Sequence, residues 1–354
     1  MSDSSRPDRG DGRTLPFDPK TDLAQLVRGV LMGAADTVPG VSGGTVALVL
    51  GIYTRLVTAV SRADGHLFSL LRRGRFKEVW TYLDGRFLFW LLVGVGGGAL
   101  TLAGITHAAM EEQYTLTFAL FSGLIAGSVL LVARLVGETG ELMSGWTPLR
   151  TALLIASAWA AYELVSLEAL ENPPIGPAYL FFCGAIAICA MILPGVSGAF
   201  LLLVLGAYHH VSGWSGRLKS FDVDGPMLLE GICFGAGLVV GLALFSKLLR
   251  WLLTRHGPAT LATLTGAMLG SLRQLWPFVG PRPDDVPFKE WRPVHLVPPL
   301  DDPQTWLALL VAAAGLGAVL LLDWFGRKRA EEPGEPTLAD GVIPPASRPL
   351  QEDG

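Results

Sequence analysis

Charged residues and cysteines are both scarce in this chain. Only 16% of the 354 residues are charged and the net charge is −4, so the sequence has no basic field that would hold nucleic acid. The cysteines show neither the spacing of a disulfide framework nor that of a metal site, and we interpret them as small buried hydrophobic residues: Cys183, Cys189 and Cys233. Apolar residues make up 51% of the chain and the mean hydropathy is +0.45, which indicates an integral membrane protein.

The common signatures of nucleotide-dependent and metal-dependent enzymes are missing as well. No Gly-Lys-Ser/Thr follows either of the glycine-rich runs described below, so neither run is a Walker loop. Histidines and carboxylates do not cluster at metal-ligand spacing. We therefore expect no cofactor, no metal and no enzymatic activity.

A five-residue motif, Pro-Gly-Val-Ser-Gly, occurs at 39–43 and again at 194–198. Each copy is followed by a similar tail, Leu-Val-Leu-Gly-Ile-Tyr at 48–53 and Leu-Val-Leu-Gly-Ala-Tyr at 203–208. Proline and glycine are poor helix formers, so we expect both apolar segments to be broken by Pro39, Gly40, Pro194 and Gly195. Two broken segments at corresponding places in two halves of a membrane protein indicate a transport site.

The apolar segments predict an all-α, polytopic membrane protein. A span needs about 20 apolar residues, and the unbroken segments of about this length are 87–108, 116–135, 149–168, 227–252, 258–276 and 304–325. The broken segments 23–60 and 178–210 are long enough either for two thin spans or for a re-entrant hairpin of two half-helices. We favour the hairpin.

Basic residues suggest how these segments are oriented. They are concentrated in the N-terminal tail, in the stretch 61–86 and after the last span, all of which should be cytoplasmic by the positive-inside rule. The first hairpin then opens to the cytoplasm and the second to the exterior, which gives two inverted repeats, each a hairpin followed by two transmembrane helices. The stretch 61–86, with leucines and aromatics between its basic residues, is expected to be an interfacial helix.

This topology predicts one membrane domain between two tails. We expect disordered cytoplasmic tails at 1–22 and 326–354 and a membrane domain at 23–325. The domain divides into repeat one at 23–135, a joining helix at 149–168, repeat two at 178–276 and a last helix at 304–325. Glycines at four-residue spacing recur in both halves and predict close helix packing rather than ligand contact: Gly94, Gly98, Gly237 and Gly241.

The start of a half-helix after each break would suit an anion. Such a start offers free backbone N–H groups and the positive end of a helix dipole, and glycine lets a phosphate approach the backbone closely. The residues predicted to bind the phosphate are Ser42, Gly43, Gly44, Thr45, Ser197 and Gly198. The alternative is that Ser42 and Ser197 only cap helices in the scaffold.

Ionisable residues within apolar segments are candidates for charge compensation or coupling. Asp36 precedes the first break, and Arg28 and Arg55 flank the same segment. Either arginine could compensate a phosphate, pair with Asp36, or extend to the cytoplasmic interface. Glu163 is expected well inside the joining helix, and Arg273 near an exit where it would attract anions.

These motifs resemble the polyprenyl-phosphate transporter family of prokaryotic membrane proteins. The resemblance rests on Gly-Ala-Ala-Asp-Thr-Val-Pro-Gly-Val-Ser-Gly-Gly-Thr at 33–45, on Leu-Gly-Ile-Tyr at 50–53, on Ala-Met-Ile-Leu-Pro-Gly-Val-Ser-Gly at 190–198, and on Gly-Ser-Leu at 270–272 with Leu-Trp-Pro at 275–277. It implies translocation of undecaprenyl phosphate from the outer to the cytoplasmic leaflet of the plasma membrane, for reuse in cell-envelope synthesis. The family often has serine after the second motif, where this chain has Ala199.

The expected partners are thus a polyprenyl phosphate, the surrounding membrane lipids, and protons or cations that offset the charge of the imported phosphate. Two other functions stay open. One is a small-anion or ion transporter on the same scaffold. The other is a polyprenyl pyrophosphate phosphatase with Ser42 as nucleophile, which is disfavoured because the hairpins offer one aspartate and no carboxylate pair.

Overall fold

The computed structural model describes residues 19–37, 42–138, 146–220, 222–283 and 294–330. These residues form helices and no strand, apart from an isolated antiparallel bridge between Val279 and His295. The helices are α1 (Pro19–Asp36), α2 (Gly43–Val49), α3 (Tyr53–Ser61), α4 (Gly65–Arg72), α5 (Phe76–Tyr82), α6 (Gly85–Glu112), α7 (Tyr114–Glu138), α8 (Pro148–Leu164), α9 (Pro177–Ile192), α10 (Gly198–Val204), α11 (Tyr208–Lys219), α12 (Gly225–Arg255), α13 (Gly257–Ser271), the 3-10 helix η1 (Leu272–Leu275) and α14 (Pro303–Ala330).

Four of the described helices are long and apolar enough to cross a membrane. Their apolar stretches are Gly85–Leu102 in α6, Tyr114–Val136 in α7, Gly225–Arg255 in α12 and Pro303–Leu321 in α14. Helix α9 is equally apolar in character but shorter, with 16 residues. The predicted all-α architecture with several apolar helices is therefore confirmed. Two of the six predicted unbroken spans are shorter than expected, because α8 has 17 residues and α13 has 15.

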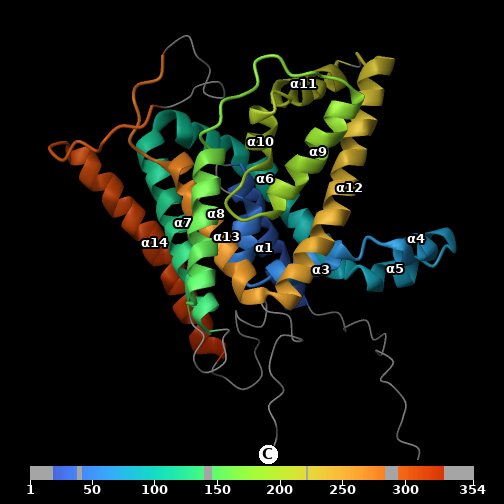
Figure 1. Ribbon diagram of the computed structural model, residues 1–354, viewed down its shortest axis with the longest axis horizontal. Helices are drawn as coiled ribbons and strands as arrows, with labels where there is room; N and C mark the ends of the chain where they lie inside the picture. The colour runs from blue at the N-terminus through green and yellow to red at the C-terminus, as the bar shows by residue number, and fades with distance from the viewer. Residues whose placement is uncertain (1–18, 38–41, 139–145, 221, 284–293, 331–354) are drawn as a thin grey trace, which may run out of the picture.

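The long helices pack in four pairs (Figure 1). Helix α1 packs along α6, and α9 along α12. The other two pairs cross between the halves of the chain, because α8 packs against α13 and α14 against α7. Figure 1 shows α14 and α7 on one side of the bundle, α9 and α12 on the other, and α1 between them.

Glycines set the distance within these pairs. A Cβ atom on Gly94 or Gly98 of α6 would overlap backbone atoms of α1, and one on Gly237 or Gly241 of α12 would overlap backbone atoms of α9. These four glycines therefore serve close helix packing, as their spacing predicted. The central core fills with buried side chains from several helices, among them Leu48, Tyr53, Phe87, Leu253 and Met268.

Several boundaries differ from those predicted. Helix α1 begins at Pro19 and so takes in the last four residues assigned to the N-terminal tail. The basic stretch forms two helices, α4 and α5, rather than one. Helix α14 continues to Ala330. Of the remaining predictions, Pro39, Gly40, the tail 1–18 and the tail 331–354 lie outside the described residues.

Candidate functional site

The first break separates α1 from α2, and side chains bond to the amides that open α2. Ser42 is the N-cap, and its Oγ accepts a hydrogen bond from the amide of Gly44 at 3.1 Å. The amide of Gly43 donates to Oδ1 of Asp36, the last residue of α1, at 2.6 Å. Two N–H groups that a short helix leaves without backbone partners are thus satisfied from within the break.

The second break separates α9 from α10 and has a related but looser geometry. Gly195 has φ +84°, a left-handed conformation that strains any residue with a Cβ. A Cβ there would also lie 2.8 Å from the Cα of Met268. Ser197 caps α10, where its Oγ accepts from the amide of Phe200 at 3.4 Å. Both serines therefore act as N-caps, which is the structural role that the sequence left open for them.

The two breaks contact one another directly. The Ser42 hydroxyl donates to the carbonyl oxygen of Met191 at 3.1 Å, and the amide of Gly195 donates to Oγ1 of Thr45 at 3.0 Å. Ser42 and Thr45 are both buried, with 3% and 1% of their surfaces exposed. Polar groups of two segments about 150 residues apart in sequence thus satisfy each other in the interior.

A third bond across the breaks comes from a residue that sequence reasoning missed. The hydroxyl of the buried Tyr53, the first residue of α3, donates to the carbonyl oxygen of Ile192 at 3.0 Å. Gly44 also packs closely here, because a Cβ on it would lie 2.7 Å from the same carbonyl oxygen. The signal for Tyr53 was present, since a tyrosine closes both copies of the repeated tail.

The arginines predicted beside the first break have other partners. Arg55 forms a bidentate ion pair with Asp84, at 2.7 and 3.1 Å, and its guanidinium lies 4.3 Å from the ring centre of Phe87. Arg28 donates to Oε1 of Gln25 at 3.3 Å. Among the residues that the structure describes, neither arginine forms an ion pair with Asp36. The sequence did not identify Asp84 because it lies within the basic stretch 61–86.

The two remaining charged candidates lie around the end of α8. Glu163 is exposed and is the last residue but one of α8, which ends at Leu164, so the prediction that it lies well inside the joining helix is wrong. The guanidinium of Arg273, in η1, lies 4.3 Å from the ring centre of Tyr162. Neither residue hydrogen-bonds with the residues that join the two breaks.

Helix η1 carries a buried polar atom without a partner. In the described part of the chain, Oε1 of Gln274 is the one buried side-chain oxygen or nitrogen that makes no hydrogen bond. The adjacent end of α13 reaches the second break, where Oγ of Ser271 lies 2.8 Å from the position of a Cβ on Gly195. An acceptor with no internal partner is available to a bound polar molecule.

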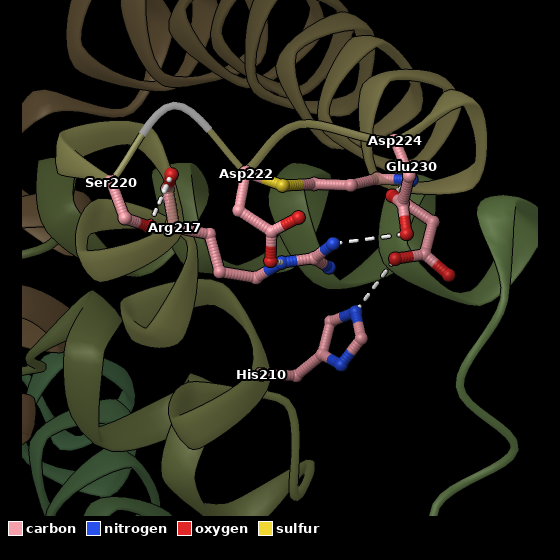
Figure 2. Close-up of polar contacts among 7 residues, drawn as sticks. His210, Arg217, Ser220, Asp222, Asp224 and Glu230 are labelled. Atoms are coloured by element: carbon pink, nitrogen blue, oxygen red, sulfur yellow. Dashed lines mark hydrogen bonds and ion pairs between the residues drawn. The ribbon is translucent and has the colours of Figure 1, made fainter.

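A separate polar cluster joins α11 to the start of α12 (Figure 2). His210 Nε2 and Glu230 Oε2 are 2.7 Å apart, and Arg217 contacts both Asp222 and Asp224, at 3.5 and 2.9 Å. The hydrogen bond from Arg217 holds the pKa of Asp224 below its usual range. No group of three or more potential metal ligands occurs within the described segments. We interpret this cluster as a set of contacts that hold α11 against the start of α12.

Comparison with known proteins identifies the family. Residues 32–282 match the VCA0040-like family, described as undecaprenyl phosphate translocase-like. The chain is 35% identical over 329 residues to the polyprenyl-phosphate transporter of Vibrio cholerae serotype O1, which covers 90% of this chain and 99% of that protein. It is 30% identical over 261 residues to the polyprenyl-phosphate transporter of Staphylococcus aureus, which covers 71% of this chain and 85% of that protein. No solved structure shows a significant match. The chain therefore belongs to the undecaprenyl phosphate translocase-like family.

Proposed function

We propose that this protein moves undecaprenyl phosphate from the outer to the cytoplasmic leaflet of a prokaryotic plasma membrane, with the phosphate bound where the two broken segments meet. The lipid phosphate does not cross unaided, because burying its charge in hydrocarbon is costly. The protein needs to shield only the headgroup, while the prenyl tail remains in lipid. The names of the two bacterial relatives support a polyprenyl phosphate as the substrate, and the description of the family supports undecaprenyl phosphate.

The observation that carries the proposal is the contact between the two breaks. Ser42, Thr45 and Tyr53 from the first broken segment bond to the backbone of the second at Met191, Gly195 and Ile192. Irregular backbone is tolerated at membrane depth only where protein or a polar cavity surrounds it. Because the polar groups of each break bond to the other break, hydrogen-bond donors and acceptors from both are gathered at one place.

On binding, the phosphate would replace the internal hydrogen-bond partners of these groups. The amides at the start of α2 and α10 would donate to phosphate oxygens in place of Asp36 and the serine side chains, and the hydroxyls of Ser42 and Thr45 would turn from backbone groups to the ligand. The proposed phosphate-binding residues are Ser42, Gly43, Gly44, Thr45, Ser197 and Gly198. Arg28, Arg55 and Arg273 are proposed to compensate its charge, and Arg55 would then have to leave Asp84.

We also propose that the halves are inverted repeats with re-entrant hairpins. The pairing of helices supports this arrangement, because α1 with α6 corresponds to α9 with α12, and α7 with α14 corresponds to α13 with α8. The glycines that make these contacts also match in position. Gly123 and Gly127 of α7 approach α14, whereas Gly266 and Gly270 of α13 approach α8. On this proposal α14, which follows repeat two in the sequence, corresponds to α8, which follows repeat one, and each packs against the other repeat.

Import of a phosphate against an inside-negative potential costs about 2.3 kcal/mol per charge per 100 mV, so a coupled proton or cation would offset the cost. Asp36 is the proposed proton carrier, because its carboxylate accepts from Gly43 at the start of α2 and would have to release that amide to the phosphate. Glu163 is a weaker candidate, since it is exposed at the end of α8. Transport by Asp36→Asn should lose the pH dependence of the wild type. An unchanged pH profile would exclude Asp36 as the carrier.

The proposed binding site is tested by a leaflet-resolved assay of undecaprenyl phosphate in proteoliposomes. Ser42→Ala should slow translocation roughly tenfold, the effect of losing about one hydrogen bond to a charged group, and Ser197→Ala should slow it as well. Ser246→Ala is the matched control, because that serine is fully buried but its hydroxyl bonds, among the described residues, only to Ala243 of its own helix. Wild-type rates in both Ser42→Ala and Ser197→Ala would show that these serines only cap helices.

The same vesicles distinguish the other two functions. A small-anion transporter would take up soluble inorganic phosphate without any prenyl lipid. A phosphatase would release inorganic phosphate from undecaprenyl pyrophosphate, and Ser42→Ala would abolish that release.

A further inference from the structure

Helices α4 and α5 form a short hairpin between α3 and α6. Gly74, with φ +67°, lies in the turn that joins them. Figure 1 shows the pair extending sideways from the bundle, well away from α11. Helix α6 follows α5 after only two residues, and the Arg250 side chain of α12 donates to Ser61 at the end of α3, at 3.4 Å. The hairpin therefore lies beside the ends of two helices that are able to cross a membrane.

Hydrogen bonds hold the base of this hairpin in a defined position. Oδ1 of Asp64 accepts from the amides of His66 and Leu67, both at 3.0 Å, and caps α4. Its other oxygen accepts from the hydroxyl of Tyr82, the last residue of α5, at 2.7 Å. Arg62 donates to the Tyr82 carbonyl oxygen at 2.7 Å. The two helices thus present one fixed surface.

That surface combines exposed apolar side chains with free cations. The exposed fractions are 68% for Phe68, 68% for Phe76, 49% for Trp80 and 44% for Leu71. Arg75 is paired with Glu78 at 2.5 Å. The other basic residues here are exposed and form no ion pair with any described residue: Arg72, Arg73 and Lys77. Such apolar area is unfavourable in water and favourable at a bilayer interface.

We propose that the α4–α5 hairpin binds the anionic phospholipid surface of the leaflet in which α6 begins. Gly85 starts the apolar stretch of α6, so the hairpin that precedes it lies at the level of the lipid headgroups. Phe68, Leu71, Phe76 and Trp80 enter the boundary between headgroups and acyl chains, while the unpaired cations contact anionic headgroups. This inference requires only that the chain is a membrane protein and is independent of the proposed transport function.

The test uses the full chain in lipid nanodiscs of phosphatidylcholine, with and without phosphatidylglycerol. A nitroxide label is placed at Phe76→Cys in a background lacking the three native cysteines. Its collision rates with oxygen, which dissolves in lipid, and with a water-soluble nickel complex report whether the hairpin is immersed. In phosphatidylglycerol discs the label should be accessible to oxygen and shielded from nickel.

A variant that combines Arg72→Gln, Arg73→Gln and Lys77→Gln should bind the membrane surface more weakly, so that the label becomes more accessible to nickel. Each cation near an anionic surface contributes about fivefold to binding, so their joint loss should weaken docking roughly 100-fold. Arg255→Gln is the control, because it removes an exposed cation of α12 outside the hairpin. High salt on the unsubstituted hairpin should reproduce the loss without any change in charge.

Three results would overturn the proposal. Access of nickel to the label in both kinds of disc would place the hairpin in water. Shielding from both reagents would mean that a second copy of the chain covers it. If the label were immersed to the same extent with and without phosphatidylglycerol, in the triple variant and at high salt, anionic lipid would play no part in the binding of the hairpin.

Discussion

Replacing Tyr53 with phenylalanine should destabilise the protein by breaking one of the three bonds between the broken segments. Tyr53 is 1% exposed, and its hydroxyl donates to the carbonyl oxygen of Ile192 at 3.0 Å. Ile192 is the last residue of α9, and the last four carbonyl groups of a helix have no partner within it. The substitution removes a single oxygen atom and leaves the ring in place, so the main effect is to leave a buried carbonyl group without a donor.

Such an orphaned acceptor costs about 1–3 kcal/mol of folding free energy. Tyr179→Phe is a matched control, because the Tyr179 hydroxyl donates to the carbonyl oxygen of Leu205 at 2.6 Å, within the second half of the chain. Tyr179 is less buried than Tyr53, so its loss should cost less. The comparison separates the general cost of losing a tyrosine hydroxyl from the cost of losing a bond between the two breaks.

The assay follows the loss of helical circular dichroism during heating in detergent. Tyr53→Phe should unfold at a lower temperature than the wild type, by a larger margin than Tyr179→Phe. If Tyr53→Phe protein were as heat-stable as the wild type while Tyr179→Phe was not, the contact between the breaks would contribute nothing to stability.

Two further predictions concern packing and pH. Gly94→Val should force α1 away from α6 and cost about 1–3 kcal/mol in thermal unfolding. A Cβ on Gly96 of the same helix would meet no atom of the described residues within 4 Å, so Gly96→Val should be near neutral; equal effects would contradict the packing role of Gly94. Hydrogen bonds from the amide of Leu67 and from Tyr82 lower the pKa of Asp64. Its contribution to the hairpin is therefore present above its unfolded pKa of about 4 and is lost as the pH falls through the lower folded value. The protection of the α4 amides from hydrogen exchange, measured relative to the intrinsic exchange rate at each pH, should fall over that range, and in Asp64→Ala it should be low at neutral pH already.

The helix breaks and the close glycine contacts followed from local chemistry, which is why the sequence was sufficient to predict them. Gly195 takes a left-handed conformation, and Gly94 and Gly237 meet backbone atoms of the paired helix, as residues without a Cβ do. The end of α8 carried no such signal, because no proline or glycine follows Leu164 closely. The prediction from hydropathy alone therefore made that helix too long and put Glu163 in its interior.

Partners across the fold were not accessible to the same reasoning. Nothing in the sequence near Arg55 distinguishes Asp84 from Asp36 as its ion-pair partner, since the choice depends on how α3 lies against the start of α6. The bond from Ser42 to Met191 likewise joins residues 149 positions apart. The repeated motif predicted that the two breaks have a common role, but only the packing of the helices shows which atoms of each break meet.

The two copies of the motif are alike in sequence and unlike in charge, and this difference bears on how the proposed site would work. Asp36 and Met191 occupy matching positions three residues before the two prolines. Oδ2 of Asp36 lies 2.7 Å from the position of a Cβ on Gly43, and Cγ of Met191 lies 2.5 Å from that on Gly198. One side chain thus covers the start of α2 and another the start of α10, but only the first is an acid. A phosphate would displace an apolar side chain at the second break and a carboxylate at the first. Because like charges repel, binding at the first break would require Asp36 to move away or to take up a proton, and that requirement would link the passage of the phosphate to the pH on the side where Asp36 is accessible.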